Sequence, residues 1–212
     1  MIKLYSYWRS SASARVRIAL NLKGIEYEYI PVNIIKDGGE QFSEQYRALN
    51  PQARVPLLVD GDFTLGQSLA ILEYLEAKAP QPALIPADPR ARARMWAFCH
   101  AIASDIQPLQ NTGPLAYLTR EIGEDKKNLW VRHWIERGLS ALEAERKHES
   151  AFVFGETPTL ADCVLVPQML NAERFGCDLK KFPRLHAVSQ HCRTLEAFAA
   201  ALPERQPDAP KS

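Results

Sequence analysis

The spacing of hydrophobic and polar residues changes once along this chain, near residue 80. Before that point, alternating apolar runs typical of half-buried strands are interleaved with segments whose apolar residues recur every three or four positions, as in helices. The pattern predicts the order β-α-β-α-β-β-α. Strands are expected at 2–7, 26–34, 55–59 and 63–65, and helices at 12–23, 41–49 and 66–79. This order favours one small α/β domain.

A proline-rich stretch follows, with four prolines between positions 80 and 89. Proline breaks both helices and strands, so this stretch predicts an extended interdomain linker. Past it the apolar spacing is helical throughout, and Thr159-Leu-Ala-Asp162 has the pattern of a capping box. Helices are expected at 90–106, 108–118 and 126–146, around the apolar run 163–170, and at 183–202, before a polar tail at 203–212. The predicted domains are therefore 1–80, a linker at 81–89 and an all-helical domain at 90–212.

Composition narrows the class of protein. With 212 residues, 46% of them hydrophobic and 24% charged, the chain has the make-up of an ordinary globular protein. Its formal net charge of +1 favours neither nucleic acid nor a membrane surface, and no apolar run reaches transmembrane length. The N-terminus lacks the pattern of a signal peptide, and the cysteines and histidines lack metal-binding spacing. We therefore expect a cytoplasmic protein with unpaired thiols and no metal, nucleic-acid or membrane partner.

Two stretches carry candidate chemistry. Ser10 and Ser11 lie in a serine-rich turn just before the first predicted helix, and Gln67 and Ser68 begin a later one. The first amides of a helix lack intrahelical partners and the helix dipole favours negative charge there, so each stretch could hold an anion. Both could equally be plain N-caps, which stabilise a helix by about 1 kcal/mol. Local sequence alone leaves the two interpretations open.

Several longer motifs resemble the zeta class of the glutathione transferases. The resemblance covers essentially the whole chain, and within the class it is strongest to the isomerases that act on maleylpyruvate or maleylacetoacetate, with maleylpyruvate preferred. The class signature usually has Cys and Trp where this chain has Ala12 and Ala14. The motifs are Ser10-Ser11-x-x-x-Arg15-Val-Arg17-Ile-Ala-Leu20, Ala48-Leu-Asn-Pro51, Gln67-Ser-Leu-Ala-Ile71, Ile106-Gln-Pro-Leu-Gln-Asn111, Asn171-Ala-Glu-Arg-Phe175 and Arg205-Gln-Pro-Asp208.

The resemblance implies a fold and a cofactor. It implies a thioredoxin-like N-terminal domain that binds glutathione, an all-helical C-terminal domain that carries part of the substrate site, and a homodimer. Val55 would pair with glutathione through its backbone before a cis proline, Pro56. The residues implied to bind glutathione are Ser10, Ser11, Gln41, Val55, Gln67, Ser68, Gln107 and Asn111.

The implied reaction is a cis-to-trans isomerisation in the breakdown of aromatic compounds. The thiolate of glutathione adds to the double bond of a small dicarboxylate, the bond rotates, and the thiolate leaves. Ser10 is favoured as the donor to the sulfur, with Ser11 second. Arg9 and Arg174 would bind the carboxylates, although either could instead be a solvent-exposed surface charge. Arg15 and Arg17, two positions apart, are expected to be structural salt-bridge or snorkelling residues.

Two other functions compete with this hypothesis. A zeta-type transferase or dehalogenase acting on small α-halo acids would use the same thiolate and the same arginines, so the sequence does not separate it from an isomerase. A non-enzymatic, ligand-binding member of the fold belongs to a different class. That function predicts the loss of the serine turn or of Gln67 and Ser68, and both are present.

Overall fold

The computed structural model describes residues 1–146 and 149–211, and the chain divides into two compact units. The first unit combines Met1–Leu84 with Leu195–Ser212, and the second is Ile85–Thr194. The first unit contains a four-stranded sheet, and the second is helical. The unit boundaries differ from the predicted domains because residues 195–211, expected in the helical part, pack with the N-terminal unit.

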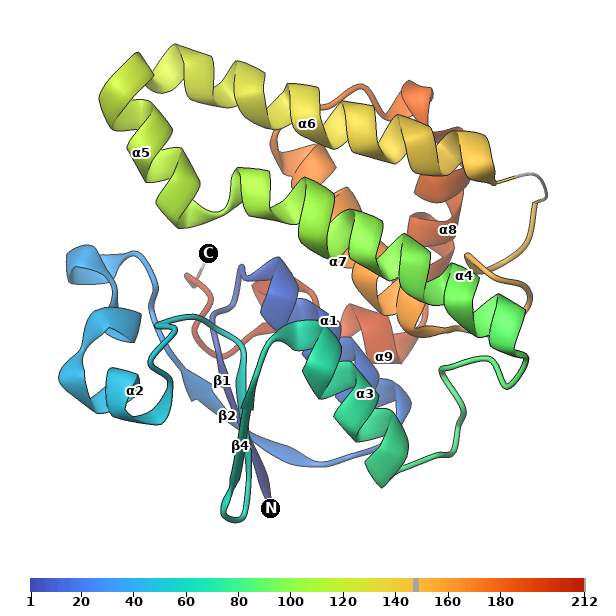
Figure 1. Cartoon of the computed structure of the whole chain (residues 1–212), viewed down its shortest axis with the longest axis horizontal. Coiled ribbons are helices and arrows are strands. Elements are labelled where there is room, and N and C mark those ends of the chain that lie inside the picture. The colour runs from blue at the N-terminus through green and yellow to red at the C-terminus, as the bar shows by residue number, and fades with distance from the viewer. Residues whose placement is uncertain (147–148, 212) are drawn as a thin grey trace. The chain divides into compact units, whose positions relative to one another are not determined.

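A mixed sheet forms the centre of the first unit (Figure 1). Its strands lie in the order β2-β1-β3-β4; β1 is parallel to β2 and antiparallel to β3, and β3 is antiparallel to β4. The β3–β4 connection is the tight Asp60-Gly61-Asp62 hairpin that the sequence predicts. This β-α-β unit followed by a hairpin confirms the thioredoxin-like topology. The strands are β1 (Ile2–Ser6), β2 (Tyr27–Pro31), β3 (Leu57–Asp60) and β4 (Phe63–Gly66).

Helix α1 (Ser11–Leu22) is the most buried element of this unit. It packs against α3 (Ser68–Lys78) and the short α9 (Glu196–Ala199), and its residues from Ser13 to Leu20 are all buried. The helix ends where Gly24 takes a φ of +62° and the amide of Ile25 donates to the carbonyl of Leu20. This Schellman motif needs a left-handed residue, which explains the glycine.

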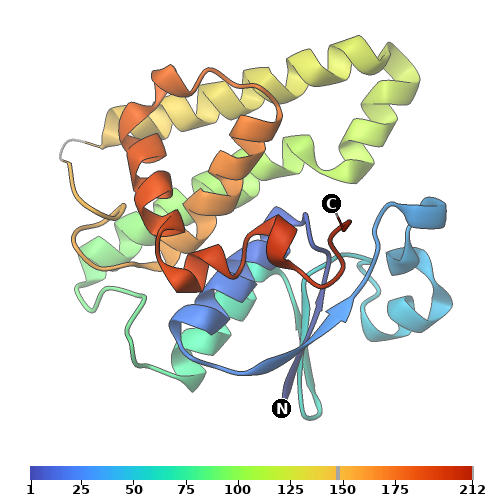
Figure 2. The same ribbon diagram turned by 180° about the vertical axis from the view of Figure 1, so that it is seen from behind.

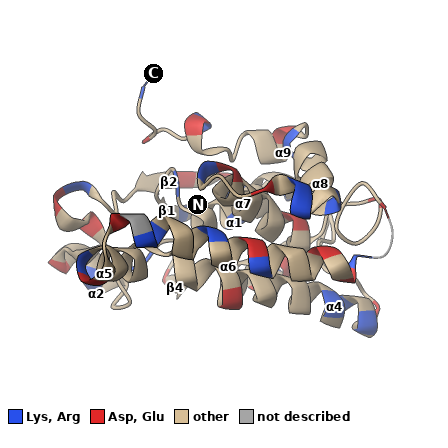
Figure 3. Cartoon of the chain, turned by 90° about the horizontal axis from the view of Figure 1, so that it is seen from above, with Lys and Arg blue, Asp and Glu red and all other residues tan. Residues whose placement is uncertain are grey.

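The second unit consists of helices around α7 (Leu160–Arg174). The Thr159–Asp162 capping box is confirmed at its start, and most of α7 is buried. Helix α4 (Pro89–His100) continues into a π-helical segment at Ala101–Ile106 and a 3-10 turn at Gln107–Gln110. Charges of both signs occur along α6 (Figure 3). The remaining helices are α5 (Thr112–Ile122), α6 (Glu124–Glu145) and α8 (Pro183–Arg193).

Three predicted boundaries were wrong. The helix expected at 41–49 is a 3-10 turn (Glu40–Phe42) followed by α2 (Glu44–Leu49), because Ser43 caps a new helix by accepting from the amide of Tyr46. The helix expected at 108–118 instead runs from Thr112 to Ile122, as α5. The helix expected at 183–202 stops at Arg193, since Leu195 is extended and starts the short α9.

The C-terminal segment is the one expected as a polar tail at 203–212, of which residue 212 lies outside the described part. It folds back along the first unit (Figure 2), where Gln206 is buried and donates to the carbonyls of Ala200 and Leu202. Asp208 accepts hydrogen bonds from the Trp8 amide and the Tyr29 hydroxyl. Among the helices of the described residues, none is both long and apolar enough to cross a membrane.

Candidate functional site

The serine turn connects β1 to α1. Ser10 is the N-cap of α1, with extended backbone (φ −72°, ψ 117°), and its Oγ accepts from the amide of Ser13 at 3.2 Å. The N-cap interpretation is therefore correct. Capping uses only the hydroxyl oxygen of Ser10 as an acceptor. The hydroxyl hydrogen can still be donated to a ligand. Ser10 and Ser11 are both half-buried, so they are accessible to a ligand at the first turn of the helix.

A second helix N-terminus, that of α3, lies in the same unit. Gln67 precedes the helix with a φ of +66°, a left-handed conformation that is uncommon for a residue other than glycine. Such backbone strain persists where the surrounding structure enforces it and is concentrated at ligand-binding sites. Ser68 begins the helix, is buried, and accepts a hydrogen bond at 3.2 Å from the guanidinium of Arg15. Backbone amides, a hydroxyl and a nearby cation together suit a carboxylate.

The snorkelling interpretation of Arg15 and Arg17 is wrong. Their exposed fractions are 1% and 0%, and both guanidinium groups lie inside the first unit. Arg15 contacts Ser68 at the start of α3, whereas Arg17 contacts backbone carbonyls of the serine turn. Burial lowers the pKa of Arg17. Two positions apart on one helix, these two arginines support the two different N-terminal segments of the candidate site.

Val55 precedes a cis peptide bond to Pro56, as the family resemblance implied. The pairing of β3 begins at Leu57, so the backbone of Val55 lies outside the sheet. The loop before it is shaped by Asn50, which is buried and donates to the carbonyl of Arg54 at 2.8 Å. The hydroxyl of Tyr46 donates to the same carbonyl at 2.7 Å. These two hydrogen bonds to the Arg54 carbonyl fix the backbone that immediately precedes Val55.

Gln41 has an unused acceptor. Its side chain is buried, and Nε2 donates to the carbonyl of Ile34 at 3.3 Å. Oε1 has no hydrogen-bond partner among the described residues, although it is shielded from solvent. A buried acceptor without a donor is unfavourable by about 1–3 kcal/mol unless a ligand supplies one. A peptide-like cofactor carries N–H donors, so its binding would satisfy this buried oxygen.

Two candidates lie in the second unit, at the turn between α4 and α5. Gln107 begins the 3-10 turn and Asn111 is the N-cap of α5; both are half-buried. The Asn111 side chain makes no capping hydrogen bond to the helix. Gln110 holds the turn to α7 through a buried hydrogen bond to Gln168 at 2.8 Å. The structure thus places Gln107 and Asn111 at the two ends of one 3-10 turn.

The two candidate arginines are each held beside an aromatic ring. The guanidinium of Arg9 lies 5.3 Å from the centre of the Trp8 ring, within the first unit. That of Arg174, at the end of α7 in the second unit, lies 4.4 Å from the Phe175 ring and donates to Asn171 at 3.1 Å. These contacts orient each cation, and a guanidinium is the side chain whose planar fork of donors matches a carboxylate.

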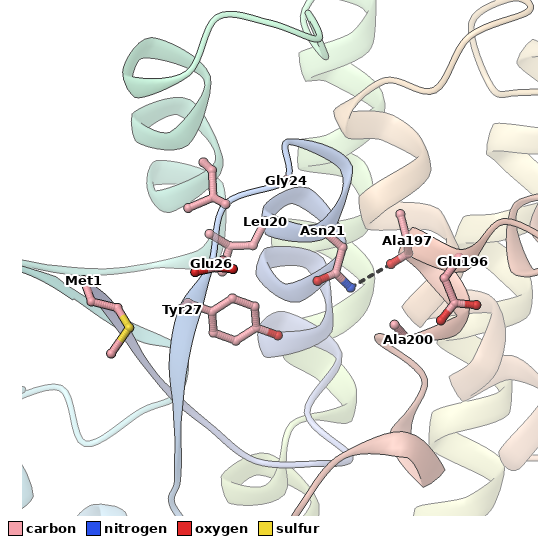
Figure 4. Close-up of a pocket in the computed structure, with 10 residues that line it drawn as sticks. Met1, Leu20, Asn21, Gly24, Glu26, Tyr27, Glu196, Ala197 and Ala200 are labelled. Atoms are coloured by element: carbon pink, nitrogen blue, oxygen red, sulfur yellow. Dashed lines mark hydrogen bonds between the residues drawn. The ribbon is translucent and has the colours of Figure 1, made fainter.

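A hollow of the first unit lies at the end of α1 that is remote from the serine turn (Figure 4). Asn21 donates to the carbonyl of Ala197 across it, and its charged side chains are Glu26 and Glu196. Two carboxylates disfavour an anionic ligand, so this hollow is not a second candidate for the same chemistry. The four cysteines, all among the described residues, are buried and form no disulfide, and burial raises the pKa of Cys177 to about 11. The described residues contain no cluster suited to a metal ion; His148 lies outside them.

Sequence reasoning did not select three residues that support the candidate site. Arg15 and Asn50 lie inside the motifs that resemble the zeta class, and this position could have marked them as site residues. Their contacts with Ser68 and the Arg54 carbonyl are seen only in the structure. The third is Gly39, with φ at +107°: a Cβ there would lie 2.4 Å from Nε2 of Gln41. The Gly-Gly pair of this loop was the only trace of that requirement in the sequence.

Comparisons with known proteins agree with this geometry. Residues 4–83 match the model of the glutathione S-transferase N-terminal domain, and residues 115–196 that of the C-terminal domain. Maleylacetoacetate isomerase of Rattus norvegicus is 47% identical over 208 residues, covering 98% of this chain and 94% of the relative.

Two solved structures extend the match to three dimensions. A maleylpyruvate isomerase described as a bacterial zeta-class glutathione S-transferase superposes with a TM-score of 0.94 at 45% identity, covering 98% of this chain and 100% of the other. Maleylacetoacetate isomerase of Anaeromyxobacter dehalogenans, solved with dicarboxyethyl glutathione and citrate in its active site, gives a TM-score of 0.88 at 44% identity, covering 100% and 98%. By its sequence, its topology and these full-length matches, the chain belongs to the glutathione S-transferase family, in the zeta class.

Proposed function

We propose that this protein is a glutathione-dependent cis–trans isomerase that converts maleylpyruvate or maleylacetoacetate to the fumaryl isomer. The observation that carries the proposal is the pairing of a half-buried serine N-cap with a second helix N-terminus whose Ser68 is backed by a buried guanidinium. Full-length relatives named as isomerases of these two compounds support the choice of reaction. We place the reaction in the breakdown of aromatic compounds.

Glutathione fits the groups in the first unit. The α3 N-terminus, with Gln67 and Ser68, suits the carboxylate of the γ-glutamyl end, and the backbone of Val55 suits the cysteinyl part. The buried Oε1 of Gln41 can accept from an amide of the tripeptide. Ser11, Gln107 and Asn111 complete the set of residues that we assign to the cofactor. The structures of relatives with bound glutathione support this assignment.

When bound, glutathione supplies the nucleophile of the reaction, a thiolate whose addition makes the double bond temporarily single so that it can rotate. Ser10 donates its hydroxyl hydrogen to the sulfur. The bond that Ser10 Oγ accepts from the Ser13 amide fixes the oxygen and polarises the hydroxyl. The unpaired amides at the start of α1 favour the negative charge as well. Because Ala12 stands where the class signature usually has a cysteine, the proposed mechanism uses no protein thiol at that position.

The substrate is a dianion, and we assign its recognition to Arg9 and Arg174. A guanidinium binds a carboxylate with two parallel hydrogen bonds, and it also stabilises negative charge that develops on an adjacent carbonyl. The stacking of each guanidinium on an aromatic ring limits the conformational freedom that would be lost on binding. The citrate named in the relative's structure supports a site for small polycarboxylates.

We further propose that the protein is a cytoplasmic homodimer. The four cysteines, all within the described residues, form no disulfide, which fits a reducing compartment. Strand β4 is an edge of the sheet and carries Phe63, which is 44% exposed, so this edge is available for contact with a second copy. Sedimentation at several concentrations measures the stoichiometry, and a monomer at every concentration would rule the dimer out.

The function is tested by assaying purified protein with freshly prepared maleylpyruvate and maleylacetoacetate. We expect isomerisation to the fumaryl product that requires glutathione in catalytic quantity only. The same preparation is offered α-halo acids in parallel. Halide release without isomerisation would replace the proposed function with that of a transferase, and binding of glutathione without either reaction would indicate a carrier.

Arg174→Ala tests the assignment of the carboxylate contact. Loss of a charged hydrogen-bond partner amounts to about 1.5–3 kcal/mol, so we expect KM for the diacid to rise by roughly 10- to 100-fold. The Kd for glutathione should stay nearly constant. Arg137→Ala is the matched control, because Arg137 also stacks on an aromatic ring, Trp134, but belongs to no assigned site. Wild-type kinetics in Arg174→Ala would remove Arg174 from the mechanism.

A further inference from the structure

The backbone just before Ser10 is held on several sides by buried or partly buried side chains. The turn Tyr7–Ser10 closes with a hydrogen bond of 2.9 Å from the Ser10 amide to the Tyr7 carbonyl. Arg17 donates to the carbonyls of Tyr7 and Trp8, at 3.3 and 3.1 Å. Asp208 accepts from the Trp8 amide at 3.0 Å. Both polar backbone groups of Trp8 are therefore bound by side chains, that of Arg17 nine positions away and that of Asp208 at the other end of the chain.

Arg17 also connects this turn to the C-terminal segment. Its exposed fraction is 0%, and its second terminal nitrogen donates to the Ala201 carbonyl at 3.0 Å as well as to Trp8. Its first terminal nitrogen contacts the hydroxyl of Ser6, where β1 ends. One guanidinium thus bridges the end of β1, the serine turn and residue 201.

Asp208 is itself fixed in place. Its second oxygen accepts from the Tyr29 hydroxyl at 2.6 Å, and burial together with this bond raises the pKa of Tyr29, which keeps it a donor. Upstream, the buried Gln206 donates to two carbonyls of its own segment, at 2.9 and 2.8 Å. The carboxylate that binds Trp8 therefore rests on β2 and on an ordered tail (Figure 2).

We propose that Arg17 and Asp208 are positioning residues for the thiolate-activating serine, so that the C-terminal segment is part of the catalytic apparatus. They touch neither substrate nor cofactor and act through the Trp8 peptide. A displacement of about 1 Å in a positioned group can reduce a rate by about 100-fold. Holding Trp8 at both its amide and its carbonyl fixes the conformation from which the Ser10 hydroxyl reaches the sulfur. This inference rests on the proposed role of glutathione and adds residues to it.

Asp208→Ala is the principal test, because Asp208 is only partly buried and its removal leaves the core intact. We expect the pKa of bound glutathione's thiol, followed by the ultraviolet absorbance of the thiolate, to rise. We expect kcat to fall about tenfold while the Kd for glutathione changes less than about threefold, since the α3 contacts are unaltered. Ser10→Ala gives the reference for complete loss of the hydroxyl. Glu204→Gln, an exposed change in the same tail, is the matched control.

The thiolate absorbance distinguishes a role of Asp208 in positioning Ser10 from a role in the stability of the protein alone. If Asp208→Ala lowers the urea midpoint but leaves the pKa of the bound thiol unchanged, the proposal is overturned. A raised pKa in a protein without isomerase activity would support the positioning role and refute the proposed reaction. Wild-type protein that binds no glutathione would overturn both. Arg17→Lys, which cannot span the Tyr7 and Trp8 carbonyls, should act in the same direction as Asp208→Ala.

Discussion

At the scale of single residues, the candidate cofactor site depends on small features that make room or supply one contact. Gln41 is folded back inside the first unit, with one acceptor unused in the described structure. It can lie there only because Gly39 has no side chain, since a Cβ would approach Nε2 to 2.4 Å. A glycine that binds nothing thus governs a residue that we assign to glutathione.

This dependence gives a direct test. Gly39→Ala should displace the Gln41 side chain, and loss of one hydrogen bond of about 0.5–1.5 kcal/mol should weaken glutathione binding by roughly 2- to 10-fold. Titration calorimetry measures the Kd. Gly38→Ala is the control, because Gly38 also has a positive φ of +84° but no atom lies within 4 Å of its added Cβ. Equal affinities in the two variants would separate Gly39 from the site.

At the scale of elements, the start of α7 holds a buried carboxylate. Asp162 accepts from the amides of Val153 and Thr159, and the sulfur of Cys192 lies 4.0 Å from it. Burial nevertheless raises the pKa of Asp162 from 3.8 to about 6, against the effect of these hydrogen bonds. The capping box therefore keeps an acid whose ionisation is unfavourable in the folded protein.

The sign of the pH dependence follows from linkage. Between pH 3.8 and about 6 the folded protein binds more protons at Asp162 than the unfolded chain does, so the contribution of this group to stability falls as pH rises. Asp162→Asn keeps an acceptor and removes the titration. Across that window we expect wild type to lose free energy of unfolding relative to Asp162→Asn in urea melts. Glu156→Gln controls for net charge; a pH-independent difference would contradict the assignment.

At the scale of the whole molecule, the first unit is discontinuous in sequence. Helix α1 packs on α9, Asn21 donates to the Ala197 carbonyl, and Arg17 to that of Ala201. The fully buried Phe198 belongs to the same segment. A thioredoxin-like fragment that ends at Leu84 would expose these groups and leave the guanidinium of Arg17 short of an acceptor.

We therefore expect fragment 1–84 to be less stable than the same fragment joined to residues 195–212. A Gly/Ser linker of about 20 residues, with a root-mean-square span of roughly 25 Å, leaves the added segment free to find its place. Each orphaned polar group disfavours folding by about 1–3 kcal/mol, which should appear as a lower urea midpoint by circular dichroism. The joined fragment carrying Gln206→Ala and Asp208→Ala is the control. Coincident midpoints for all three would show that the segment contributes nothing to this fold.

Local sequence determined much of this protein. The strand and helix order in residues 1–80, the hairpin at Gly61 and the Thr159–Asp162 capping box all depend on interactions within a few positions, and each is confirmed. The sequence also indicated the family and its cofactor, because the motifs that carry the resemblance are continuous segments of the chain. Placement of the helix ends was less accurate, because Ser43 and Leu195 end one element and begin another by contacts that a period of three or four does not reveal.

Tertiary structure alone decided what Arg15, Arg17 and Asp208 do. In the sequence two of them are charges on a helix and the third lies in a polar tail. In the fold, the arginines are buried against Ser68 and the serine turn, and Asp208 binds an amide 200 positions away. The physical reason is that a buried charge is stable only where the fold supplies hydrogen-bond partners, and those partners come from segments whose proximity exists only after the chain has folded.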